Sequence, residues 1–152
     1  MTIEKEHQWL RGAFAQPDAA LKVEFSDLKA TADGYLISAL RRAKRRVALW
    51  TALCDLAGVW ALEEVTEALS KFADLACQMS LNHALKVQLQ RGKIPTRKPE
   101  TDPAELGMFV LAMGKLGANE LNYSSDIDLI CFFDESYFAS VDVFEARAGF
   151  IR

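Results

Sequence analysis

Two aspartates separated by a single residue, Asp126 and Asp128, stand at the start of an apolar run over residues 127–133, which is rich in β-formers and predicts a strand. In a β-strand the side chains at i and i+2 point to the same face, so we expect the two carboxylates side by side, roughly 6–7 Å apart along the strand. Neighbouring carboxylates repel each other unless a cation lies between them. Mg²⁺ suits such an oxygen-only site, since it takes one or two protein carboxylates and keeps its other positions for water and phosphate oxygens. The pair therefore predicts metal-dependent chemistry on a phosphate, with Asp126 and Asp128 as metal ligands and catalytic residues. Two polar residues that merely begin a strand are the alternative.

A glycine-containing turn precedes the aspartates. Gly114, Lys115 and Gly117 follow the continuous apolar run 106–113, which is typical of a buried strand. Glycine allows a positive φ or a close approach of the backbone to a phosphate, and the Lys115 ammonium supplies a charge that can pair with one. A Walker loop is excluded, because Leu116 stands where that loop requires Ser or Thr. We therefore predict a phosphate- or nucleotide-binding turn at Gly114, Lys115 and Gly117.

Polar residues fill the short segment between this turn and the aspartates. The hydroxyls or backbone N–H groups of Ser124 and Ser125 are candidates for holding phosphate oxygens, although a purely structural role in a turn is equally compatible with their positions. Glu120 is interpreted as a capping or orienting residue. Asn122 and Tyr123 are candidates for facing a substrate.

The stretch from Phe109 to Phe133 resembles the signature of the glutamine synthetase adenylyltransferase/adenylyl-removing enzyme family, a branch of the nucleotidyltransferase superfamily. The residues that carry the resemblance run from Gly114 to Ile130, in the pattern G-K-L-G-x-x-E-L-N-Y-S-S-D-I-D-L-I. Lys115 departs from the broad superfamily, which has Ser after the glycine, and agrees with the adenylyltransferase family. A weaker likeness extends upstream through residues 40–85.

The resemblance implies a Mg²⁺-dependent nucleotidyltransferase that controls glutamine synthetase. Family members carry two similar halves: one attaches AMP from ATP to a tyrosine of glutamine synthetase, and the other removes it by phosphorolysis and releases ADP. The implied partners are glutamine synthetase, a PII-type signal protein, and ATP or phosphate and ADP. Asn122, Tyr123 and Ile127 resemble the N-terminal, adenylyl-removing half more than the attaching half.

The superfamily adds a third carboxylate on a later strand. Nothing in residues 135–152 has the pattern of that strand, and residues 141–152 are predicted to form a helix. By resemblance, the chain is therefore expected to be a piece of a longer protein that holds the beginning of a nucleotidyltransferase domain. Two metal ligands without the third bind Mg²⁺ weakly, so we expect residues 1–152 alone to be inactive.

Helical periodicity identifies the elements that precede the site. Apolar residues recur every three to four positions over residues 35–57 and again over 61–91, and Gly58 and Gly92 are expected to end these helices. The short connection predicts that the two helices pack antiparallel. Residues 17–34 are ambiguous: a helix can start at Pro17 and Asp18 and run through Leu21, and Ser26 with Asp27 can cap another helix.

The fold class expected from these elements is α+β. Residues 1–92 are predicted to form a helical segment, residues 93–103 a Pro-rich linker, and residues 104–152 the incomplete start of a nucleotidyltransferase-type mixed α/β domain.

Composition excludes several classes of function. The net charge of −3 argues against nucleic acid as a partner, and no apolar run approaches the ~20 residues of a membrane span. Cys54, Cys77 and Cys131 lie far apart, which favours buried thiols in a reducing cytoplasm over disulfides or a zinc site. The basic run 41–46 is either a docking face for an acidic partner or phosphate, or a solvated helical face.

Two other functions remain compatible with the residues. The chain could serve another Mg²⁺-dependent nucleotidyltransferase that acts on a signal protein, a small molecule or RNA, although the Gly114-Lys115 turn and the low basicity count against RNA. It could also be a non-catalytic regulatory or docking module whose carboxylates have no catalytic role.

Overall fold

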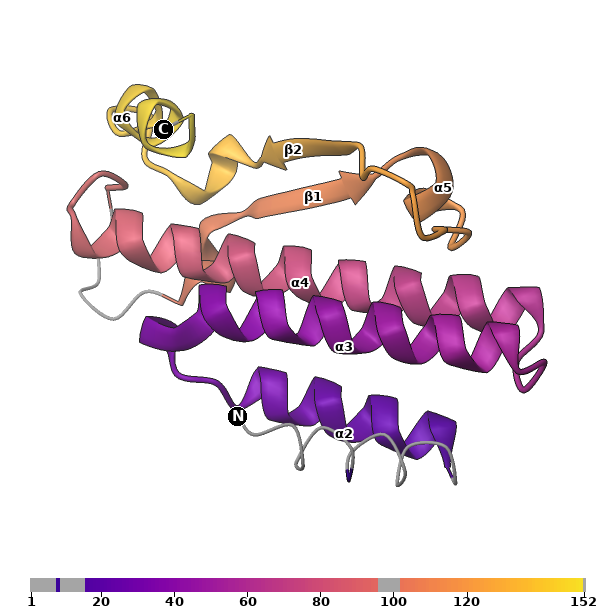
Figure 1. The fold of residues 1–152 in the computed structure, drawn as a ribbon. Helices are drawn as coiled ribbons and strands as arrows, with labels where there is room; N and C mark the ends of the chain where they lie inside the picture. The colour runs from indigo at the N-terminus through magenta and orange to yellow at the C-terminus, as the bar shows by residue number, and fades with distance from the viewer. Residues whose placement is uncertain (1–7, 9–15, 96–101, 152) are drawn as a thin grey trace. The chain divides into compact units, whose positions relative to one another are not determined.

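The computed structural model describes residues 8, 16–95 and 102–151 (Figure 1). The chain divides into two compact units. The first, here called the helical unit, comprises residues up to Ala76 together with Gly114–Ile127; the second, the strand unit, comprises Cys77–Met113 together with Asp128–Arg152. In chain order the elements are α2 (Pro17–Lys29), η1 (Asp33–Tyr35), α3 (Leu36–Leu56), α4 (Leu62–Gln90), η2 (Pro103–Leu106), β1 (Met108–Ala112), α5 (Gly114–Gly117), β2 (Leu129–Phe133), η3 (Glu135–Tyr137) and α6 (Val143–Phe150). The α+β class expected from the sequence is confirmed.

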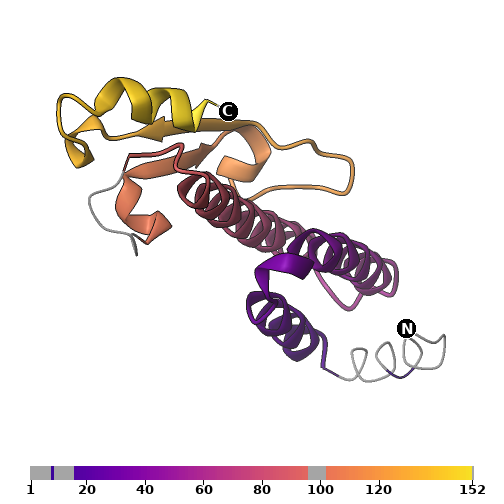
Figure 2. The same ribbon diagram turned by 90° about the vertical axis from the view of Figure 1, so that its left-hand side faces the viewer.

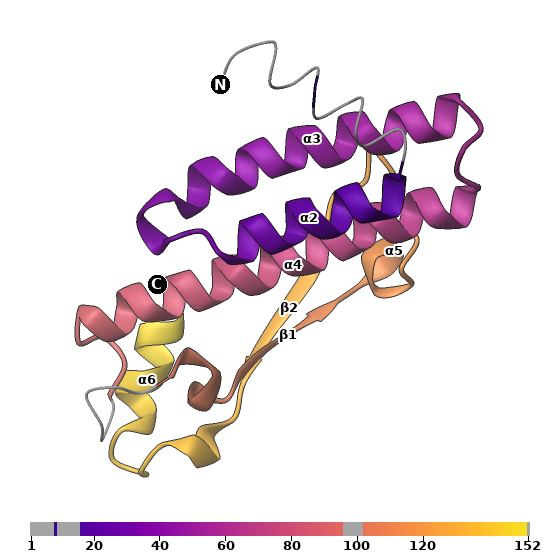
Figure 3. The same ribbon diagram turned by 90° about the horizontal axis from the view of Figure 1, so that it is seen from below.

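The long helices in the described part of the helical unit are α2, α3 and the first half of α4, which lie side by side and run in alternating directions (Figures 1 and 3). The observed bounds of α3 and α4 lie within a residue of those predicted from periodicity. Gly58 ends α3 with φ +65°, and the N–H groups of Gly58 and Val59 donate to the carbonyls of Asp55 and Cys54. This is a Schellman motif, in which glycine takes the left-handed position without a Cβ penalty.

Helix α2 is continuous, so the predicted second helix capped at Ser26 and Asp27 is wrong. Both residues lie inside α2. Glu24 and Leu28 are four positions apart, share one face of the helix, and are both buried. Packing along this face carries the helix through the two residues whose local preference favours a cap.

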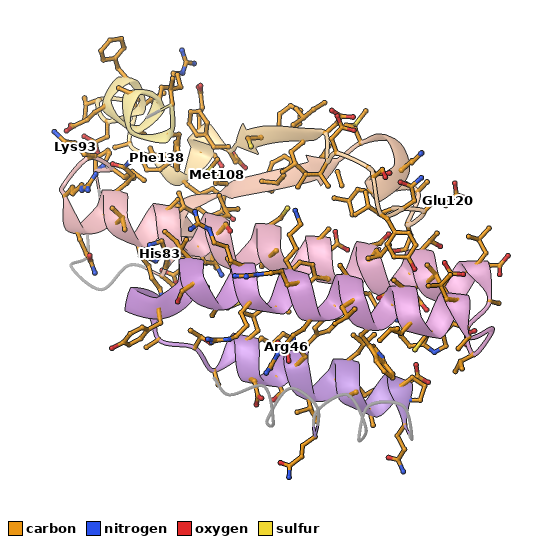
Figure 4. The ribbon with its side chains drawn as sticks, in the orientation of Figure 1. Arg46, His83, Lys93, Met108, Glu120 and Phe138 are labelled. Atoms are coloured by element: carbon orange, nitrogen blue, oxygen red, sulfur yellow. The ribbon has the colours of Figure 1, made fainter. Side chains whose placement is uncertain are left out.

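The core of the helical unit is complete around Trp50, Cys54 and Val65, whose side chains are fully or almost fully buried. The basic run 41–46 is divided between different environments. Arg46 lies between α3 and α2 (Figure 4) and its guanidinium donates to the Glu24 carboxylate at 3.0 Å. The run is therefore not a single basic face, because one of its cations is used inside the unit.

The strand unit contains one antiparallel pair of strands, with Met108 opposite Phe133 and Ala112 opposite Leu129. The strands were predicted to span residues 106–113 and 127–133, and the second prediction began too early. One residue outside the strands, the N–H of Met113, which follows β1, donates to the carbonyl of Asp128, which precedes β2, at 2.9 Å. Gly114, with φ +56°, then turns the chain away, so no partner remains for an earlier start of β2.

The predicted burial of the first strand is wrong for the described residues. Phe109 and Leu111 each remain 48% exposed, and Phe109 stacks on Phe132 of the neighbouring strand at a centroid distance of 5.3 Å. A continuous apolar run predicts cover on both faces, but the described sheet has two strands only. The opposite face has some cover, since Met108 packs on a small core formed by Leu85, Ile94 and Leu106.

Helix α6 lies beside the strand pair (Figures 1 and 2) and is shorter than the predicted span 141–152. Phe150 packs against Phe133 with ring centroids 4.7 Å apart. Gly149 faces the loop after α4, where an added Cβ would overlap the backbone carbonyl oxygen of Lys93. The aromatic contact and the absence of a Cβ at Gly149 together allow α6 to approach the rest of the unit closely.

The remaining predictions concern the cysteines, the linker and membrane-spanning segments. Cys54 is buried as expected, whereas Cys131 is exposed on β2 because the strand pair is incompletely covered. Residues 96–101 lie outside the described part of the chain, so the linker predicted at 93–103 is seen only at its ends. The division of the chain into domains stays a prediction. Among the described helices, none combines the length and the apolar character that crossing a membrane requires.

Candidate metal and phosphate site

The predicted phosphate-binding turn is a single helical turn closed by defined hydrogen bonds. Gly114 begins α5 with φ +56°, a conformation that favours glycine. Asn119 follows with φ +61°, and the N–H groups of Asn119 and Glu120 donate to the carbonyls of Leu116 and Lys115. This pattern is a second Schellman motif, with asparagine at the left-handed position. Glu120 thus takes part in ending α5 through its backbone, while its side chain is exposed (Figure 4).

Gly114 and Gly117 differ in their conformational needs. Of the two, Gly114 alone has a positive φ, and Gly117 is an ordinary helical residue. Lys115 is exposed at the start of α5, and Leu116 turns inward and is buried. The binding of phosphate by Gly114, Lys115 and Gly117 stays a prediction.

A hydrogen bond to α4 holds the chain just after this turn. The backbone N–H of Leu121 donates to the hydroxyl of Ser70 at 3.1 Å, and both residues are buried. The two residues are 51 positions apart in the sequence. Ser70 was not predicted as a site residue, since no sequence pattern links it to Leu121.

A tight turn joins Leu121 to Asp126. The Asn122 side-chain oxygen accepts hydrogen bonds from the Ser125 hydroxyl at 2.6 Å and from the Ser124 N–H at 3.2 Å. The Ser125 N–H and hydroxyl also bond the Asn122 backbone. Asparagine commonly stabilises a turn in this way. The turn role thus accounts for the Ser125 hydroxyl and for both serine N–H groups, whereas the Ser124 side chain is exposed; phosphate binding by either serine stays a prediction.

Tyr123 connects the same turn to α3. Its hydroxyl donates to the Asp55 carboxylate at 3.2 Å. Burial, followed by this hydrogen bond and the negative charge of Asp55, raises the pKa of the Tyr123 phenol to about 12. The hydroxyl therefore stays protonated and remains a donor at neutral pH. Asp55, like Ser70, is a residue that the sequence alone did not single out.

Asp126 is exposed and borders a cavity of about 490 Å³ within the helical unit. The cavity walls are α3, α4 and the segment after Leu121. Apolar side chains form most of the lining, with Lys44 of the basic run and Ser125 among its polar residues. Asp126 thus meets both water and a partly apolar hollow, and a cationic side chain borders the same space.

Asp128 is the first residue of the strand unit and is also exposed. The prediction that the two aspartates lie within the strand is wrong, since β2 begins one residue later, at Leu129. Asp128 contacts the sheet through its backbone carbonyl, which leaves its carboxylate available to water and ions.

The donor set fits Mg²⁺ as a partial site. Both carboxylates are exposed, and Mg²⁺ commonly uses one or two protein carboxylates and completes its octahedron with water and phosphate oxygens. No group of three or more potential ligands occurs among the described residues. The binding of a metal ion by Asp126 and Asp128 stays a prediction.

A comparison with protein families matches residues 5–150 to the model of glutamate-ammonia ligase adenylyltransferase. The match covers nearly all of the chain. The chain belongs to this family. The resemblance seen between Gly114 and Ile130 is therefore confirmed.

Curated relatives agree with the family. The chain is 47% identical over 117 residues to the bifunctional glutamine synthetase adenylyltransferase/adenylyl-removing enzyme of Bradyrhizobium sp. (strain ORS 278). This match covers 77% of this chain and 12% of the relative. The enzyme of the same name from Rhodopseudomonas palustris (strain TIE-1) is 45% identical over 127 residues, or 82% of this chain and 13% of the relative. For that from Rhizobium meliloti (strain 1021) the identity is 44% over 102 residues, 67% of this chain and 10% of the relative.

The chain thus spans about an eighth of the length of the curated relatives it matches. No solved structure matches it.

Proposed function

We propose that the chain supplies Asp126 and Asp128 as Mg²⁺ ligands for nucleotidyl transfer on glutamine synthetase. In this proposal the full-length protein removes AMP from a modified tyrosine of glutamine synthetase by phosphorolysis, attaches AMP from ATP, or does both. The observation that carries the proposal is the exposure of both aspartates, in the expected motif, within a chain of the adenylyltransferase family.

The reaction is a displacement at the phosphorus of AMP. The metal would stabilise the charge that develops on the phosphate oxygens. Asp126 and Asp128 would bind and orient that metal, and the exposed Lys115 would pair with the phosphate or triphosphate. In phosphorolysis an oxygen of inorganic phosphate forms a bond to the AMP phosphorus while the bond from that phosphorus to the tyrosine oxygen breaks. The whole adenylyl group therefore passes to phosphate as ADP, and the tyrosine recovers its hydroxyl with the proton that phosphate gives up.

We assign this segment to the adenylyl-removing half. Asn122, Tyr123 and Ile127 support that assignment, because they match the removing half where the attaching half tends to differ. The site as described has two carboxylates, and residues 1–152 alone are expected to show no turnover, because a further ligand is needed for firm metal binding. A PII-type signal protein is proposed as the regulator of the full-length protein.

The test uses the full-length protein with Mg²⁺ in two reactions. The first contains adenylylated glutamine synthetase and phosphate, and ADP is followed; the second contains unmodified glutamine synthetase and ATP, and pyrophosphate is followed. Asp126→Asn and Asp128→Asn keep side-chain size and remove the charge. We expect both variants to lose ADP release by at least about a hundredfold, the scale seen when an electrostatic group at a reaction centre is removed.

Asp134→Asn is the matched control. Asp134 lies just beyond the other end of β2 and accepts a hydrogen bond from the Ser136 N–H, which asparagine can also accept. This control should retain full turnover. Loss of pyrophosphate release alone in the Asp126 variant would move the segment to the attaching half. Unchanged turnover in both reactions would refute catalysis and favour a docking module.

A further inference from the structure

We propose that Ser70 of α4 and Asp55 of α3 are positioning residues for Asp126. They fix the turn that ends at Ser125, and through it they set where the Asp126 carboxylate is presented. The proposal rests on the proposed function at one point, the catalytic role of Asp126. The anchoring itself is independent of that role and can be tested without it.

Ser70 provides the stronger anchor. Its side chain is fully buried, and its hydroxyl accepts the hydrogen bond of the Leu121 amide at 3.1 Å. A buried backbone N–H needs a partner, and losing that partner costs more than an average hydrogen bond contributes. Thr51, the other fully buried hydroxyl residue among the described residues of this unit, donates to the Val47 carbonyl of its own helix at 2.7 Å. Of these two buried hydroxyls, that of Ser70 is therefore the one that links two segments distant in sequence.

Asp55 provides a second, solvent-exposed anchor. It lies in the last turn of α3, where its carbonyl accepts the Gly58 N–H of the Schellman motif. Its carboxylate receives the Tyr123 hydroxyl at 3.2 Å. The turn is thus tied to α4 at Leu121 and to α3 at Tyr123, on two different helices of the same unit.

The turn transmits these two anchors to Asp126. Hydrogen bonds between Asn122 and Ser125 close the turn directly before the aspartate. Little backbone freedom remains between the anchors and Asp126, so loss of an anchor should displace or loosen the carboxylate. A catalytic site keeps its rate only while its groups stay within well below an ångström of the reactive geometry, so such a displacement should lower the rate.

Amide hydrogen exchange of the full-length protein tests the anchoring directly. In Ser70→Ala we expect the Leu121 amide to exchange at least about fivefold faster, since the loss of one hydrogen bond changes an opening equilibrium by about that factor. Two controls accompany it: Thr51→Val removes the other buried hydroxyl, and Ser80→Ala makes the same change at an exposed site of α4. Neither control should alter exchange at Leu121. Unchanged exchange in Ser70→Ala would overturn the anchoring.

Kinetics test the positioning role. Ser70→Ala and Tyr123→Phe should lower kcat for ADP release and raise the Mg²⁺ concentration for half-maximal rate by about fivefold, with little change in the KM for glutamine synthetase. Asp55→Asn, which keeps an acceptor oxygen, should retain most of the rate that Asp55→Ala loses. If Ser70→Ala fails to fold, Tyr123→Phe and the Asp55 pair still decide the question.

The positioning role and the proposed function of Asp126 can be refuted separately. Faster exchange with unaltered kcat and Mg²⁺ dependence, in an enzyme that Asp126→Asn inactivates, would overturn positioning. If Asp126→Asn itself left turnover intact, the proposed function would fail while the exchange result would still judge the anchoring.

Discussion

The helical unit buries Trp50 and Cys54 completely, whereas in the strand unit the apolar residues Phe109 and Leu111 of β1 remain 48% exposed. The two units also divide the aspartate motif. Asp126 belongs to the well-packed helical unit and follows an anchored turn, while Asp128 opens the strand unit and is tied to it by one backbone hydrogen bond. We therefore predict that Asp126 is held more rigidly than Asp128.

The largest effect is expected from the helical core. Trp50→Ala should lower the free energy of unfolding by about 3–5 kcal/mol, because it removes a large, fully buried side chain and leaves a cavity. Chemical denaturation followed by circular dichroism of the 152-residue chain measures it. Leu56→Ala, at a strongly exposed position of the same helix, is the control and should cost little. Equal losses in the two variants would contradict the assignment of the core.

A smaller and more local effect is expected in the strand unit. Gly149→Ala should destabilise the packing of α6 by about 1–3 kcal/mol, because the new Cβ overlaps the Lys93 carbonyl. Gly34→Ala is the matched control, since an added Cβ there meets open space. Amide exchange should accelerate in α6 and leave α3 unchanged. Accelerated exchange throughout α3 as well would show that the two units are not separable in stability.

The Tyr123 hydrogen bond predicts a pH dependence at alkaline pH. The folded-state pKa of Tyr123 is about 12 against an ordinary value of 10.0, so its contribution to stability is fully present below pH 10 and is lost as the pH rises to about 12. Phenolate absorbance should show one tyrosine that titrates late, and Asp55→Asn should lower its pKa. An unchanged titration in Asp55→Asn would mean that the hydrogen bond is absent in solution.

The smallest effect concerns a surface ion pair of the strand unit. Arg147 of α6 donates to the Glu135 carboxylate, and both side chains are about half exposed. Exposed pairs contribute about 0–1 kcal/mol and are screened by salt. Glu135→Gln should therefore cause only a very small shift of the denaturation midpoint, and the shift should be smaller still at high salt. A shift as large as that of Gly149→Ala would show that this pair fixes α6.

Local signals account for what the sequence predicted well. The ends of α3 and α4 were placed within a residue because Gly58 and Gly92 adopt the left-handed conformation that ends helices. Leu28 shows where local preference fails, since its burial carries α2 through two residues that favour a cap. The start of β2 was misplaced because register depends on the partner strand, which ends before Gly114.

Non-local contacts could not be predicted from the sequence. The aspartate motif and its glycine turn were found from spacing, but the bonds that hold them come from Ser70 and Asp55, which are 51 and 68 residues away from their partners. Neither residue differs in type from many other serines and aspartates of the chain. The burial of β1 was overestimated because an apolar run shows only that a strand can be buried on both faces. It does not show whether another described segment of the chain covers those faces.

The metal site is tested most directly by Mn²⁺ binding to the full-length protein, measured by electron paramagnetic resonance as a probe for the Mg²⁺ site. Wild type, Asp126→Asn, Asp128→Asn and the control Asp134→Asn are compared at one protein concentration. We expect Asp126→Asn and Asp128→Asn each to lose one equivalent of bound Mn²⁺ and Asp134→Asn to bind Mn²⁺ as wild type does. Wild-type binding in both Asp126→Asn and Asp128→Asn would contradict a metal site at this motif.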